Sequence, residues 1–136
     1  MSDQDDMEHP LELARGRRQG LDVSDNPRQG LDYLVSLEGT MPAGPGRQAL
    51  TIGLRYVPDR YLLPTHSFSR YLASLDGNAW HSIEALGADM LGDLDSELLP
   101  RWLQVRVGAG AEYRVTLEQK QPDWENRVMM VRIPID

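Results

Sequence analysis

Four short segments with alternating apolar and polar residues, two before and two after a central region of helical spacing, constrain this chain most. The alternation covers residues 33–37, 50–56, 103–107 and 113–117. A period of two is typical of half-buried strands. Residues 41–48 and 108–110 are rich in Gly or Pro and predict loops. Because each pair of strands is joined by a short connection, the two pairs predict hairpins in an antiparallel sheet.

Between the two strand pairs, apolar residues recur at helical spacing and predict two helices. The first follows Thr65 or Ser67 as a capping residue, and the second spans about 79–94. Their inward faces are expected to carry Phe68, Tyr71, Leu72 and Leu75, and Ile83, Leu86, Gly87, Met90 and Leu94. The order predicts an α+β domain (ββααββ) with an antiparallel sheet and two helices packed on one face. Residues 128–135 are expected to add a fifth strand.

The chain has 136 residues, which fits one compact domain. Residues 1–30, which contain the pentapeptide RQGLD at 18–22 and 28–32, are expected to form a flexible N-terminal arm. Residues 31–136 are expected to form the folded domain. The chain has no cysteine, which excludes disulfides, thiolate metal sites and a Cys nucleophile.

The charge pattern weighs against several partners. A formal net charge of −7 argues against nucleic acid. No apolar run reaches the roughly 20 residues of a membrane helix, and the acidic first ten residues lack a secretory signal. We therefore expect a cytoplasmic protein. Between Arg70 and Arg101 there is no basic residue but six acids, interpreted as a solvated helix face or, alternatively, as a patch that docks a basic partner: Asp76, Glu84, Asp89, Asp93, Asp95 and Glu97.

Residues 56–81 contain three linked motifs. They are the turn Tyr56-Val57-Pro58-Asp59, the run PTHSFSRY at 64–71, and the step Trp80-His81-Ser82. In this order they resemble the 7-cyano-7-deazaguanine reductases of queuosine synthesis, and the resemblance extends over about 32–117. It implies a tunnelling fold (T-fold), a homo-oligomer whose sheets close into a barrel, and a purine- or pterin-like ring bound where subunits meet. NADPH is implied by the resemblance alone.

The reactive positions of that family are replaced in this chain. Its Cys nucleophile falls at Met41, whose thioether cannot be deprotonated, and its Asp proton donor falls near Gln48. The remaining replaced positions, two ring-reading Glu and two Lys, fall at Pro64, Ser82, His66 and Ser69. We therefore assign no catalytic residue and do not expect nitrile reduction.

Five residues are the candidate ligand contacts: Thr65, His66, Ser67, His81 and Ser82. The first three stand at a predicted helix N-terminus, where they bind an anion or simply cap the helix. His81 matches the family's His and is either a ligand contact or a ring bonded to a backbone carbonyl. The three histidines have no metal-ligand spacing, so no metal site is expected.

Three functions remain open. The first is a non-catalytic relative that binds a planar ring or serves as a partner subunit. The second is an enzyme of altered chemistry on the same fold, an NADPH-dependent oxidoreductase relative with His81 as its acid–base group. The third is an interaction module, or scaffold, that uses the acidic helix face together with Arg15, Arg17, Arg18 and Arg28 of the arm.

Overall fold

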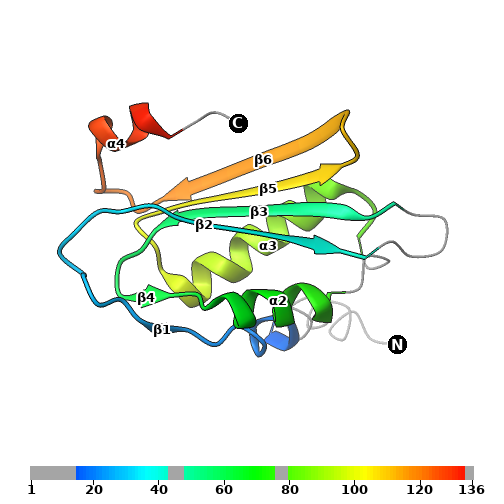
Figure 1. Cartoon of the computed structure of the whole chain (residues 1–136), viewed down its shortest axis with the longest axis horizontal. Coiled ribbons are helices and arrows are strands. Elements are labelled where there is room, and N and C mark those ends of the chain that lie inside the picture. The colour runs from blue at the N-terminus through cyan, green and yellow to red at the C-terminus, as the bar shows by residue number, and fades with distance from the viewer. Residues whose placement is uncertain (1–14, 43–47, 76–79, 134–136) are drawn as a thin grey trace, which may run out of the picture.

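A four-stranded antiparallel sheet forms the centre of the computed structural model, which describes residues 15–42, 48–75 and 80–133. The strands lie in the order β2-β3-β5-β6, and α2 and α3 cover one face (Figure 1). The bounds are β2 Val35–Met41, β3 Leu50–Val57, β5 Trp102–Ala109, β6 Tyr113–Lys120, α2 Thr65–Ser74 and α3 Ile83–Leu98. The α+β class, with an antiparallel sheet and two helices on one face, is confirmed.

The hydrophobic core lies between this sheet and its two helices. The alternating positions of β3 and β5 that face the helices are almost completely buried, as are three residues one turn apart on α3: Ile52, Leu54, Tyr56, Leu103, Val105 and Val107, with Met90, Leu94 and Leu98. Alternation thus predicted the buried face of each strand correctly. The second helix begins at Ile83, later than expected, because Ser82 caps it, and it continues to Leu98.

The N-terminal segment packs on the domain from residue 15 onward, which corrects the expectation of a flexible arm for that part. Residues 15–18 are helical. Leu21 is 4% exposed and belongs to the core. Strand β1, Ser24–Asp25, pairs with β4, Tyr61–Leu62, in a second small sheet (Figure 1). Residues 1–14 of the predicted arm lie outside the described residues.

The C-terminal segment is a short helix, α4, Arg127–Arg132, so the expected fifth strand at 128–135 is wrong. The side chain of Asn126 accepts a hydrogen bond from the Met129 N–H (3.0 Å) and begins the helix. Met129, Met130 and Ile133 then face the same way and pack with Trp102. These positions have helical spacing, and the end of the sheet offers an apolar surface for them. Within the described ranges, no helix is long and apolar enough to cross a membrane.

Candidate functional site

The first group of predicted site residues lies at the start of α2. Thr65 and His66 are exposed, whereas Ser67 is completely buried and its hydroxyl donates to the carbonyl of Gly20 (3.4 Å). The capping prediction is wrong here, because Pro64 occupies the N-cap position and no side chain caps the helix. Ser67 therefore fixes the N-terminal segment and offers no group to a ligand.

The second group lies at the start of α3. His81 and Ser82 are both exposed, and the Ser82 hydroxyl accepts a hydrogen bond from the Ala85 N–H (3.2 Å). Helices α2 and α3 run in opposite directions, so their N-termini lie at opposite ends of the helical layer (Figure 1). One chain therefore does not bring the five predicted residues together into one site.

Met41, which the sequence resemblance matched to a Cys, belongs to the core. It is the last residue of β2 and is 3% exposed, packed in the cluster between the sheet and the helices. Its side chain therefore fills space in the interior. A residue held in this way contributes packing, which is a structural role and not a chemical one.

The acidic face of α3 is only partly solvated, which corrects the interpretation from sequence. Asp93 is 3% exposed, and its carboxylate accepts hydrogen bonds from Arg17 Nε (2.7 Å) and from the Tyr71 hydroxyl (2.7 Å). Burial, followed by the Asp93 charge, raises the pKa of Tyr71 far above its usual value. The hydrogen bond to Asp93 raises the pKa of Arg17 as well. Asp93 thus ties the N-terminal segment to both helices.

The other described acids of α3 also have partners within the chain. Trp80 Nε1 donates to Asp89 (2.7 Å), Gln119 donates to Asp95 (3.0 Å), Arg18 pairs with Glu97 (3.5 Å), and the Tyr113 hydroxyl donates to Glu84. Asp76 lies outside the described residues. Arg17 and Arg18 pair with Asp93 and Glu97, so part of the basic segment and part of the acidic face are bound to each other within the chain.

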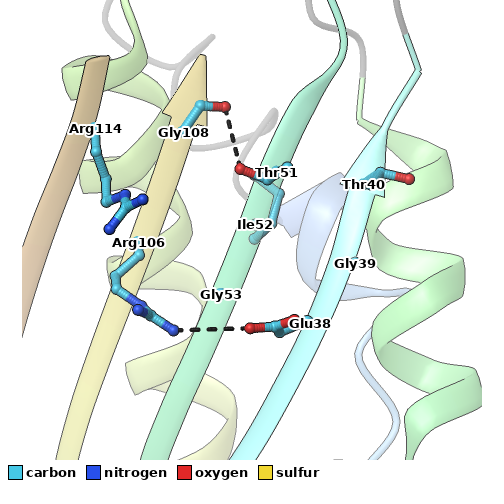
Figure 2. A pocket seen from close by; sticks show the side chains of 9 residues that line it. All are labelled: Glu38, Gly39, Thr40, Thr51, Ile52, Gly53, Arg106, Gly108 and Arg114. Carbon is cyan, nitrogen blue, oxygen red and sulfur yellow. Dashed lines mark hydrogen bonds and ion pairs between the residues drawn. The ribbon is translucent and has the colours of Figure 1, made fainter. Parts of the chain in front are cut away.

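The sheet face opposite the helices carries a hollow of about 490 Å³ (Figure 2). Its lining comes from β2, β3, β5 and β6: Glu38, Gly39, Thr40, Thr51, Ile52, Gly53, Arg106, Gly108 and Arg114. Glu38, Gly53 and Arg106 are neighbours across three strands in the sheet register. An ion pair of 4.0 Å joins Arg106 Nη2 to Glu38 Oε1 across β3. We call this site the open-face hollow.

A second hollow, of about 450 Å³, lies between β6 and the segment that leads into α4. Its apolar lining includes Trp102, Trp124 and Met130, and polar groups of β6 stand at its margin. Trp102 Nε1 donates to Glu118 (2.9 Å), and Lys120 Nζ donates to the carbonyl of Trp124 (3.0 Å). We call this site the tryptophan hollow. His81 lines neither of the two.

Neither hollow was predicted from sequence. For the open-face hollow, the available signal was that Arg106 and Arg114 occupy the polar positions of alternating strands. Side chains at such positions are ordinarily predicted to face solvent. Tyr56 and Tyr71, whose side chains face the core, do not contribute ionisable groups to either hollow. Among the residues that the structure describes, no group of three or more His, Cys, Asp or Glu could hold a metal ion.

Likeness to known proteins is found among solved structures. No protein-family model matches the chain, and no curated protein matches it significantly by sequence. The chain is similar to the crystal structure of the archaeosine synthase QueF-Like in the apo form, with 16% sequence identity and a TM-score of 0.48. The match covers 65% of this chain and 91% of that chain.

Proposed function

We propose that this chain is a non-catalytic, ligand-binding subunit that assembles with copies of itself into a closed ring of sheets. The observation that carries the proposal is that the sheet has two edge strands without a partner in the described residues. One face is covered by helices, and the two edge strands are β2 and β6. Exposed edges of seven and eight residues are templates for pairing with another chain.

The direction of the strands supports assembly by rotation. Each neighbouring pair in the order β2-β3-β5-β6 is antiparallel, so β6 runs opposite to β2. When a second copy is related to the first by rotation about an axis along the strands, its β2 meets β6 in the antiparallel sense. The ladder then continues from copy to copy, and closing the ring removes every edge.

The ligand we propose is a planar purine- or pterin-like ring in the tryptophan hollow. This hollow borders β6, so it would lie at the junction between copies. Trp124, which is half-buried, supplies a flat apolar surface for stacking, and the fully buried Trp102 backs the hollow. Glu118 supplies an acceptor for the ring edge, and Asn126 supplies the second N–H of its amide, because the first already donates to Asp32. The absence of any Cys and the burial of Met41 support a binding role without catalysis. NADPH stays a proposal from the resemblance alone.

The assembly is tested by light scattering on the purified chain and on a variant of β6. Val115 is half-buried and faces the helix side of this edge strand. A lysine there can reach water in a free subunit but is enclosed when another strand pairs, so Val115→Lys should yield monomers. Ala88→Lys, at an exposed site of α3, is the control and should leave the oligomer intact. A wild-type monomer at micromolar concentration would refute the assembly.

Ligand binding is tested separately by thermal shift with guanine, pterin and 7-cyano-7-deazaguanine, each with and without NADPH. Ligand at 100 times its Kd stabilises the folded state by about 2.7 kcal/mol, which raises the Tm by several degrees. Trp124→Ala should abolish the shift. If none of these planar ligands shifts the Tm of an oligomeric protein, the planar-ligand hypothesis is wrong. The closed assembly of subunits is then a scaffold.

A further inference from the structure

We propose that the open-face hollow binds a small organic anion through the guanidinium groups of Arg106 and Arg114. The ligand would carry a carboxylate or phosphate group together with a hydroxyl or amino group. This second site is separate from the tryptophan hollow, and residues of a single chain form all of it. It therefore does not depend on the assembly or on the ring ligand proposed above.

Two glycines keep the floor of this hollow at the level of the backbone. A Cβ atom at Gly108 would lie 2.6 Å from Thr51 Oγ1, and one at Gly53 would lie 3.1 Å from Arg106 Nε. Distances this short leave no room for a side chain at Gly108 unless Thr51 moves. The absence of side chains lets Arg106 lie across β3 and lets a ligand approach the strands closely.

The two arginines reach the hollow from neighbouring strands. Arg106 is on β5, and Arg114 on β6 pairs with Gly108, so the two arginines are diagonal neighbours on one sheet face. Figure 2 shows Arg114 extending from β6 toward β5 and Arg106 pointing across Gly53 toward Glu38. The Arg106 side chain is 21% exposed, so its position is largely fixed by the sheet. Fixed guanidinium groups lose little freedom when they bind a ligand.

The charge of the hollow is opposite to that of the chain. Two arginines and one glutamate line it, whereas the chain has a formal net charge of −7. The ion pair of Arg106 with Glu38 spans 4.0 Å, and the Glu38 side chain is 84% exposed. A pair this open contributes little on its own. An anionic ligand between the arginines gains from both of them at a small electrostatic cost to that pair.

The remaining polar groups define the chemical class of the ligand. Guanidinium groups bind carboxylate and phosphate oxygens through paired hydrogen bonds, which favours an oxyanion over a halide. The Thr51 hydroxyl donates to the Gly108 carbonyl (3.5 Å) and can still accept a hydrogen bond. Together with the Glu38 carboxylate it favours a ligand with a hydroxyl or amino donor. The volume, about 490 Å³, is within the range of small-molecule sites and too small for a folded partner.

The proposal is tested by two-dimensional amide NMR of the full chain titrated with inorganic phosphate and, separately, with succinate. We expect saturable shifts confined to the strand segments that line the hollow, at residues 38–40, 51–53, 106–108 and 114, with a Kd of about 1 mM or tighter for at least one probe. The stronger probe tells whether phosphate or carboxylate is the preferred group. Shifts that stay linear in both titrations would overturn the proposal.

Matched variants separate a built site from general charge effects. Arg114 is exposed, so Arg114→Gln should fold normally and weaken binding about tenfold, as expected for the loss of a charge-assisted pair of hydrogen bonds. Arg106→Lys keeps the charge but loses the planar guanidinium group that makes paired hydrogen bonds, so it should also weaken binding. Arg28→Gln, at an exposed position outside both hollows, changes the net charge equally and should change the Kd by less than about twofold.

Two outcomes would contradict the inference. If Arg28→Gln weakens binding as much as Arg114→Gln, the anion responds to net charge and there is no site. If the monomeric Val115→Lys variant fails to bind the probe that the wild type binds, the hollow needs a second copy and the single-chain site is wrong. Retained binding in that variant would support the site even if the ring of subunits does not form.

Discussion

Replacing Arg17 should show how strongly the N-terminal segment is bound to the helical layer. The Asp93 carboxylate is buried and accepts hydrogen bonds from Arg17 Nε at 2.7 Å and Nη2 at 3.2 Å. Arg17→Gln removes this bidentate pair and leaves the carboxylate in the interior with only the Tyr71 hydroxyl. The substitution therefore creates a buried charge with incomplete compensation.

The expected cost follows from the burial of the two side chains. Removing one partner of a buried ion pair destabilises proteins by about 3–5 kcal/mol. The Arg17 side chain is 18% exposed and that of Asp93 is 3% exposed, so we expect about 3 kcal/mol, the lower end of this range. With an unfolding entropy of about 2.1 cal/mol/K per residue, the Tm of a chain of this length should fall by about 10 °C.

Urea unfolding followed by tryptophan fluorescence measures this change, and it has a local reporter. The Arg17 guanidinium lies 5.8 Å from the ring centre of Trp80, so its loss also alters the surroundings of that ring. Arg28→Gln, at an exposed position of the same segment, is the control and should change stability by less than about 0.5 kcal/mol. In a double-mutant cycle with Asp93→Asn, we expect a coupling of about 1–3 kcal/mol. A cost below about 1 kcal/mol for Arg17→Gln would refute the argument.

Three further outcomes are expected. Because the pKa of Tyr71 is raised in the folded state, its neutral phenol contributes fully to the free energy of unfolding below pH 10, the usual tyrosine pKa, and this contribution is lost as the pH rises further. Ultraviolet titration should therefore show this phenol ionising only as the protein unfolds. Gly92→Ala should stabilise α3 by about 0.5–1 kcal/mol because nothing lies within 4 Å of the new methyl group, whereas Gly87→Ala should show no such gain because its Cβ would meet a leucine methyl at 2.7 Å. Asp32→Ala should weaken the attachment of α4 by about 1–3 kcal/mol, because it removes the oxygen that accepts the Trp124 indole N–H at 3.0 Å, and a red shift of tryptophan emission should accompany the loss.

The sequence by itself determined the order of the four central strands and the two long helices, and the buried side of each. Alternation in residues 50–56 and helical spacing around Met90 are properties of consecutive residues, and burial of one face follows directly from them. The same local reading predicted a strand for residues 128–135, which is wrong. There the Asn126 cap and the apolar surface around Trp102 decided for a helix.

Only the tertiary structure decided which polar groups meet. Arg17 and Asp93 are 76 positions apart in the chain, so no local pattern relates them. Arg55 occupies a polar strand position, yet it is 6% exposed because its neighbour across the sheet, Gln104, accepts its hydrogen bonds (2.8 and 2.5 Å). Arg106 in the open-face hollow is likewise largely covered, because it lies across β3 and pairs with Glu38. The burial and partners of a charged side chain depend on the adjacent strand, and pairing between strands is fixed only when the chain folds.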